Sequence, residues 1–99
     1  MNGGYTVQFG TLRIEKEIAK LVGKLPQGFQ QRIYDAMKGL GADPRPSQAK
    51  HLVAPLQVYG FTATHRLRVG DYRILYDVDD AARRVVILAV RRRSEKTYH

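Results

Sequence analysis

The sequence predicts an α+β domain, in the order β-α-α-β-β-β, in which two N-terminal helices pack on one face of a small, mainly antiparallel sheet. Three observations support this prediction. Apolar residues repeat at helical spacing in residues 12–40, they alternate with polar residues in 61–78, and a short apolar run follows at 84–90. The 99 residues are enough for one compact core, so residues 1–99 are expected to form a single domain.

The N-terminal half contains the expected first strand and helix pair. Residues 5–9 alternate, which predicts a short strand, and Thr11 can cap the helix that follows. Pro26 is tolerated in a first helical turn and begins a second helix, which should stop near Gly39 and Gly41. A single helix kinked at Pro26 is the alternative. The two apolar stripes are Ile14, Ile18, Leu21, Val22 and Leu25, and then Phe29, Ile33, Ala36, Met37 and Leu40.

The segment between the helices and the last strands is less regular. Residues 43–47 contain two prolines, which block helical and ladder hydrogen bonds, so a loop is expected there. Residues 50–60 fit either an ordered loop or a short strand near 56–59.

A hairpin is predicted in residues 61–78, where apolar and polar residues alternate on both sides of Gly70-Asp71. This dipeptide suits a two-residue loop, because glycine supplies the positive φ that such turns need. In the resulting register, Arg68 lies directly opposite Arg73 on the polar face of the two strands.

Residues 84–90 are apolar on both faces, which predicts a central strand after a four-residue turn. Unbroken alternation would place its even-numbered residues on the arginine-bearing side, although a slip of one residue would reverse every side chain. The face away from the helices would then carry Arg66, Arg68, Arg73 and Arg92, with Val90 and a small patch of Leu75, Val86 and Leu88.

Two arginines that face each other across a ladder destabilise the sheet by about 0.2–1 kcal/mol. The stability of the fold therefore gives no reason to place Arg68 opposite Arg73. A phosphate between them would give one, because arginine binds phosphate with two parallel hydrogen bonds and stays charged. The formal net charge of +8 likewise favours a polyanionic partner, either nucleic acid or an acidic protein. The alternative is a solvated basic surface neutralised by nearby carboxylates such as Asp71, Asp77 or Glu95.

Other chemistry finds little support in the sequence. There is no cysteine, which excludes a disulfide framework and a thiolate nucleophile, and no histidine pair has metal-ligand spacing. His65 is a candidate general base, but its alternation places it on the helix-covered face. Tyr98, at the end of the basic run, could stack on a base.

Neither a signal peptide nor a membrane span is evident, so a soluble, cytoplasmic protein is expected.

The string RLRVGDYRILY at residues 66–76, followed by an apolar strand and RRRSEKTY at 91–98, resembles the RelE/ParE toxin superfamily of bacterial toxin–antitoxin systems. The resemblance covers nearly the whole chain and implies a RelE-like microbial RNase fold. RelE-type toxins cut mRNA in the ribosomal decoding site by attack of the 2′-hydroxyl on the adjacent phosphate. The resemblance therefore implies a type II toxin that is a metal-independent endoribonuclease without a cofactor. It also implies a small acidic, RelB-like antitoxin, the ribosome and mRNA as partners, and a toxin that is monomeric alone.

The resemblance also assigns roles to residues. Arg73 would hold the scissile phosphate, Arg92 or Arg93 would protonate the leaving oxygen, and Tyr98 would orient the nucleotide. RelE itself has lysines at the positions of Arg66 and Arg68, and arginine is a poor proton acceptor, so the general base is not identified. The implied catalytic set is Arg66, Arg68, Arg73, Arg92, Arg93 and Tyr98, with Lys50, Arg91 and Lys96 contacting RNA and His65 as the candidate base.

Two other functions fit the same pattern. ParE toxins, which share the central string, inhibit DNA gyrase without cutting RNA. A non-catalytic RNA-binding domain is the third reading, but the sheet lacks the several exposed aromatic residues that such domains use.

Overall fold

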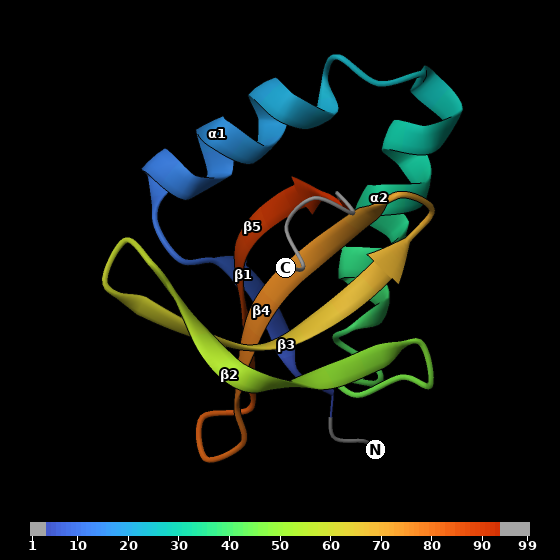
Figure 1. Ribbon diagram of the computed structural model, residues 1–99. Coiled ribbons are helices and arrows are strands. Elements are labelled where there is room, and N and C mark those ends of the chain that lie inside the picture. The colour runs from blue at the N-terminus through green and yellow to red at the C-terminus, as the bar shows by residue number, and fades with distance from the viewer. Residues whose placement is uncertain (1–3, 94–99) are drawn as a thin grey trace.

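The computed structural model describes residues 4–93, which form a five-stranded sheet with two helices on one face (Figure 1). The strand order is β1-β5-β4-β3-β2, and only β1 and β5 run parallel. The predicted α+β class is confirmed, with β2 as one strand more than the expected order. The elements are β1 (Thr6–Phe9), α1 (Leu12–Val22), α2 (Gln27–Gly39), β2 (Ala49–Val58), β3 (Phe61–Val69), β4 (Tyr72–Asp79) and β5 (Arg84–Arg92).

The helices form where the apolar stripes predict them, as two separate elements. The hydroxyl of Thr11 caps α1 by accepting from the N–H of Ile14 at 3.1 Å. The chain leaves α1 at Val22 and enters α2 after Pro26, which excludes a single kinked helix. The two helices diverge from this link and each packs mainly on the sheet, α1 on β5 and β1 and α2 on β3 (Figure 1). Both helices therefore lie on the same face of the sheet, as the sequence predicted.

The core lies between the helices and the sheet, and Tyr76 connects it to the loop that precedes β2. The ring of Tyr76 is fully buried, and its hydroxyl donates to the carbonyl oxygen of Pro44 at 2.7 Å. Burial raises the pKa of Tyr76 to about 12, so the hydroxyl keeps its proton for this bond. The buried side chains include Ile14, Ile18, Val22, Ile33, Met37, Leu40, Ile74, Val85 and Ile87.

A second polar contact joins three distant segments at the edge of the core. Asp80, in the turn between β4 and β5, accepts from the hydroxyl of Tyr5 at 2.6 Å and from Arg45 at 2.7 Å. The hydrogen bond from Arg45, followed by that from Tyr5, lowers the pKa of the Asp80 carboxyl. This network holds the β4–β5 turn, β1 and the loop before β2 in place.

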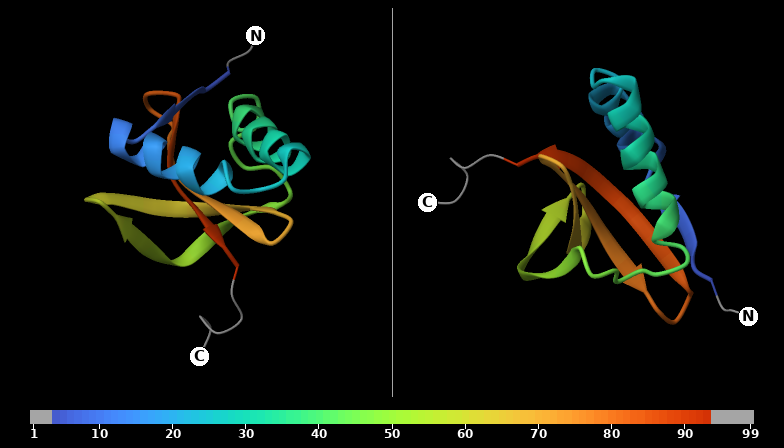
Figure 2. Two further views of the ribbon diagram at one scale, coloured as in Figure 1. Left: turned by 90° about the horizontal axis from the view of Figure 1, so that it is seen from above. Right: turned by 90° about the vertical axis from the view of Figure 1, so that its right-hand side faces the viewer.

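The tip of the β2–β3 hairpin leaves the plane of the sheet. The ladder between β2 and β3 shifts register between His51 and Leu56, and β3 pairs with β4 only from His65 onward. Tyr59 and Gly60 form the turn with φ values of 49° and 83°, the combination of two positive values that tight hairpins use. Residues 50–60 are therefore strand and turn, and Figures 1 and 2 show the hairpin extending beyond β4 on the side of α1.

The tip is attached to α1 through Tyr59. Its hydroxyl donates to the carboxylate of Glu17, with oxygen–oxygen distances of 2.8 and 2.9 Å. The guanidinium of Arg13 lies 4.7 Å from the centre of the same ring. Neither helix in residues 4–93 has the length and apolar character needed to cross a membrane.

Candidate nucleic-acid interface

Arginines from β3, β4 and the end of β5 share the sheet face that points away from the helices. Arg68 lies directly opposite Arg73, as the sequence predicted, and Arg73 in turn lies opposite Arg91 on β5. Lys50 pairs with Arg66 across the ladder between β2 and β3, so it borders the same surface. We call this surface the arginine face, and its members are Arg66, Arg68, Arg73, Arg91 and Arg93.

The turn at Gly70-Asp71 holds this register. Gly70 has a φ of 57°, and a Cβ at this position would lie 2.8 Å from the ring of Phe29 on α2, so only glycine fits. The carbonyl of Asp71 accepts from the N–H of Arg93 at 2.6 Å. This bond brings the end of β5 back to the turn between β3 and β4, which sets Arg93 beside the arginines of those strands.

Arg66, Arg68, Arg73 and Arg93 line a hollow of about 210 Å³. Arg73 is half-buried in it, and its pKa is lowered, first by burial and then by the positive charges of Arg66 and Arg68. The guanidiniums therefore raise each other's electrostatic energy, although arginine stays protonated at physiological pH. An anion bound between them would remove this cost, which makes the hollow suited to a phosphate group.

A one-residue bulge in β5 decides which C-terminal arginines reach this hollow. Leu75 pairs with Ala89, while the next residue on β4, Tyr76, pairs with Ile87. Leu88 is therefore the extra residue, and its side chain turns toward α1, where it is fully buried near Ile14.

The bulge reverses the alternation of every residue after it. Val86 comes before it and lies on the predicted face, but Leu88, Val90 and Arg92 do not, so their predicted placement was wrong. Arg92 pairs with Tyr72, whose ring packs against Phe29 of α2, with ring centres 5.6 Å apart. Arg92 thus lies on the helix side, and Arg91 and Arg93 take the places on the arginine face. The predicted site residues Lys96 and Tyr98 lie outside the described residues 4–93.

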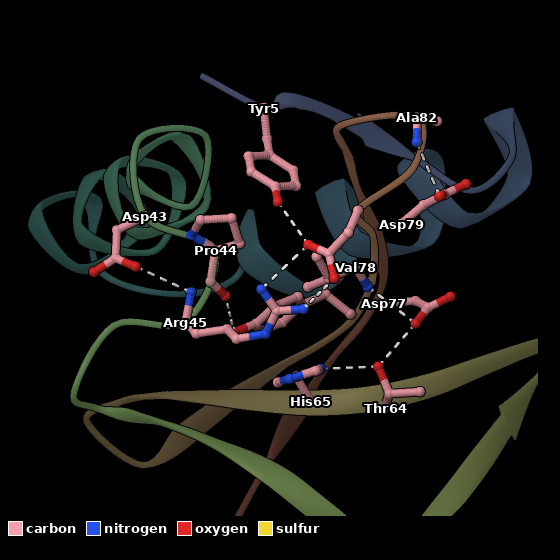
Figure 3. A network of polar contacts seen from close by, with 12 residues as sticks. Tyr5, Asp43, Pro44, Arg45, Thr64, His65, Asp77, Val78, Asp79 and Ala82 are labelled. Atoms are coloured by element: carbon pink, nitrogen blue, oxygen red, sulfur yellow. Dashed lines mark hydrogen bonds and ion pairs between the residues drawn. The ribbon is translucent and has the colours of Figure 1, made fainter. Parts of the chain in front are cut away.

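His65 lies on the opposite face of β3 from Arg66 and Arg68. Its side chain is buried, as the alternation predicted, and its ring stacks on Tyr76 with ring centres 5.4 Å apart. Thr64 donates its hydroxyl proton to Asp77 at 2.8 Å, so its oxygen accepts from Nδ1 of His65, also at 2.8 Å (Figure 3).

The surroundings of His65 favour the neutral ring. Burial, followed by the charges of His51 and Arg45, lowers its pKa. The geometry gives His65 a packing role, and its action as a general base stays a prediction that this position does not favour. Nowhere in residues 4–93 do three or more His, Cys, Asp or Glu side chains gather in a way that could hold a metal ion.

Comparison with known proteins found one matching family model and several similar solved structures. The family model of the ParE toxin of the type II toxin–antitoxin system parDE matches residues 11–97. No curated protein matches the chain. A chain of the archaeal RelE–RelB complex from Pyrococcus horikoshii OT3 is 27% identical, with a TM-score of 0.67, and the match covers 93% of this chain and 98% of that chain.

Two further solved structures are similar. A chain of the toxin–antitoxin complex RelBE2 from Mycobacterium tuberculosis is 31% identical, with a TM-score of 0.62, over 91% of this chain and 99% of that chain. A mutant of the E. coli toxin RelE in the free state is 19% identical, with a TM-score of 0.54, over 95% of this chain and 87% of that chain, and at this identity it shows the fold alone. The family match over almost the whole chain, together with these relatives, shows that the chain belongs to the RelE/ParE family of type II toxin–antitoxin toxins.

Proposed function

We propose that this toxin is a ribosome-dependent endoribonuclease that cuts mRNA in the decoding site. The observation that carries the proposal is the hollow in which Arg66, Arg68, Arg73 and Arg93 surround a space of about 210 Å³. Such a group of cations binds the phosphodiester and stabilises the additional negative charge that develops on the phosphate during cleavage.

The proposed reaction needs no metal and no covalent enzyme intermediate. The 2′-oxygen of a ribose loses its proton and attacks the adjacent phosphorus, while the bond from phosphorus to the 5′-oxygen of the next nucleotide breaks. The products are a 2′,3′-cyclic phosphate and a 5′-hydroxyl, which takes up a proton. Rate acceleration would come from holding the 2′-oxygen in line and from the charge of the arginines.

Within this proposal, the geometry supports particular roles for two of the arginines. Arg73 lies between Arg68 and Arg91 on neighbouring strands, so it is the natural holder of the non-bridging phosphate oxygens. Of the two residues that the family resemblance suggested for proton donation to the leaving oxygen, Arg93 lines the hollow and Arg92 faces the helices. We therefore assign this role to Arg93. The proton acceptor is left unassigned, since His65 lies on the other face.

An antitoxin is the expected partner. The similar chains from P. horikoshii and M. tuberculosis come from toxin–antitoxin complexes. We propose that a small, acidic, RelB-like antitoxin binds this toxin and covers the arginine face, because opposite charge favours that contact and the chain carries a net charge of +8. The toxin would act in the cytoplasm, where translating ribosomes are, and would be a monomer without its antitoxin.

A second candidate function is inhibition of DNA gyrase without nuclease activity. The observation that favours it is the name of the matching family model, which is that of a ParE toxin. The arginine hollow favours the nuclease, because simple inhibition of a protein target does not require cations gathered around a space of phosphate size.

Toeprinting on translating ribosomes tests the proposal. Purified toxin should produce truncated mRNA with ends in the ribosomal decoding site, and end analysis should find a 2′,3′-cyclic phosphate upstream and a 5′-hydroxyl downstream. Intact mRNA, together with loss of gyrase supercoiling activity in a parallel assay, would establish the second candidate instead.

A further inference from the structure

A second cavity, of about 430 Å³, borders the arginine face at the open edge of β5. β1 pairs with β5 only up to Ile87, so among residues 4–93 no strand pairs with residues 88–91 on that side. The cavity lies between this edge, α1 and the tip of the β2–β3 hairpin, and Arg91 is part of its wall. Because Arg91 is also the neighbour of Arg73, the cavity begins where the arginine face ends.

Apolar residues form part of the cavity wall, and more of the exposed lining is polar than apolar. The walls include Ile18, Leu21 and Leu88, while the carboxylate of Glu17 and the amide of Gln57 stand at the rim beside the Tyr59 ring. A volume of this size lies within the range of small-molecule sites, and the mixed lining suits a ligand that has an apolar face and polar edges.

The hairpin tip that closes the cavity is fixed rather than loose. Tyr59 occupies a left-handed backbone conformation that residues other than glycine rarely adopt, and it is held there by Glu17 and Arg13. Here the contacts set an aromatic ring and a carboxylate at the mouth of the cavity.

We infer that this cavity binds one nucleobase of the single-stranded RNA whose phosphate lies on the arginine face. The inference rests on the proposed nuclease function. Single-stranded RNA is recognised by bases that leave the stack and meet aromatic rings and hydrogen-bonding side chains. Arg91 would bind the phosphate that links this base to the scissile position.

The chemistry of the rim defines which bases fit. Glu17 offers only acceptors, and although its carboxylate accepts from Tyr59 and, at 3.4 Å, from Nε of Arg13, a carboxylate has one lone-pair site beyond these. The amide of Gln57 donates to Thr62 at 3.1 Å, which directs its oxygen elsewhere. Acceptors at the rim favour a base with an exocyclic amino group, such as adenine or cytosine, over uracil. The same carboxylate disfavours acidic side chains, so an acidic antitoxin is a poorer occupant.

The test combines a binding measurement with a map of cut sites. In the first, the wild-type toxin is titrated with short 2′-O-methyl oligonucleotides of A, C or U, which lack the attacking hydroxyl, and backbone amide resonances are followed. The A and C oligonucleotides should shift the resonances of Gln57, Val58 and Ala89 together with that of Arg73, and the U oligonucleotide should shift them less.

In the second measurement, ribosomal cut sites are mapped for wild type, Gln57→Ala and the control Gln8→Ala, which removes an exposed glutamine from the other edge strand, β1. Loss of one hydrogen bond should reduce the preference for an amino-bearing base beside the cut by about fivefold in Gln57→Ala. Gln8→Ala should cut like the wild type.

The outcomes separate the cavity from the nuclease itself. Oligonucleotides that shift Arg73 but not the cavity residues would overturn the base site and leave the nuclease intact, as would an unchanged cut-site distribution in Gln57→Ala, whether or not the free protein binds RNA. A wild-type toxin that neither binds RNA nor cuts it would overturn both.

Discussion

Arg91 lies directly opposite Arg73 in the ladder between β4 and β5, although unbroken alternation along β5 would put Arg92 on that face. The difference is the single extra residue, Leu88, which is absorbed by a bulge and buried under α1. The bulge thus gives α1 an apolar contact and replaces Arg92 on the arginine face with two cations, Arg91 and Arg93. Its consequences can be tested directly.

Arg73→Ala should reduce mRNA cleavage by about 10²–10³-fold, the range seen when one preorganised electrostatic donor is removed from an active site. The fold should survive, because Arg73 belongs to the sheet face away from the core. Cleavage on ribosomes and a thermal melt measure the two effects. Lys24→Ala, which removes the same charge from the exposed link between the helices, is the control. A folded Arg73→Ala toxin with normal cleavage would rule out the phosphate hollow.

Alanine at Arg91 or Arg93 should impair cleavage, while Arg92→Ala should cleave nearly as well as wild type. All three changes remove one charge from consecutive, exposed positions, so they differ mainly in the face that loses a cation. The rates at which the three variants cut mRNA on ribosomes test this expectation. The register of β5 would have to be revised if Arg92→Ala were as damaging as Arg93→Ala.

His65 should make stability depend on pH in a defined direction. Burial lowers its pKa below the ordinary value of 6.5, so the unfolded chain binds a proton more readily than the folded protein. The free energy of unfolding should therefore be unaffected by His65 above pH 6.5 and should fall as the pH drops below 6.5 toward the lowered pKa of the folded state. Urea unfolding across this range measures the slope, and His65→Gln should reduce it.

The same variant tests the catalytic role of His65. His65→Gln should lower the melting temperature because the stacked ring against Tyr76 is lost. The remaining folded protein should still cut RNA. Loss of cleavage at an unchanged melting temperature would identify His65 as part of the chemistry.

Tyr76→Phe should lower the free energy of unfolding by about 1–3 kcal/mol, because it leaves the carbonyl of Pro44 without its buried donor. Denaturant unfolding measures the change. Tyr34→Phe, at an exposed position on α2, should alter stability far less and serves as the control. Equal effects from the two variants would show that the bond from Tyr76 to the loop contributes little.

Deletion of Tyr98 and His99 should abolish most cleavage and leave antitoxin affinity nearly unchanged. The reason is that a terminal pair is a small part of an interface of standard size, whereas Tyr98 is expected to orient the nucleotide. Antitoxin titration and ribosomal cleavage of the truncated toxin measure both quantities. The antitoxin association rate should also fall as salt rises. Normal cleavage after truncation would remove Tyr98 from the site.

The sequence by itself determined the local elements and one central contact of the site. The apolar stripes located both helices, Thr11 marked the start of α1, and Gly70-Asp71 fixed the hairpin that sets Arg68 opposite Arg73. Each of these follows from interactions between residues close in the chain, which side-chain periodicity and turn chemistry report directly.

The tertiary structure decided the rest of the site. Residues 85–90 are apolar throughout, so their sequence does not indicate which of them face the helices and which face away. Only the packing of Leu88 under α1 shows where the bulge falls. That packing exchanges Arg92 for Arg91 and Arg93 on the arginine face. Likewise, the cavity beside Arg91 exists because Tyr59 reaches Glu17, 42 residues away in sequence. Contacts between distant segments depend on how the elements pack together, which no local pattern records.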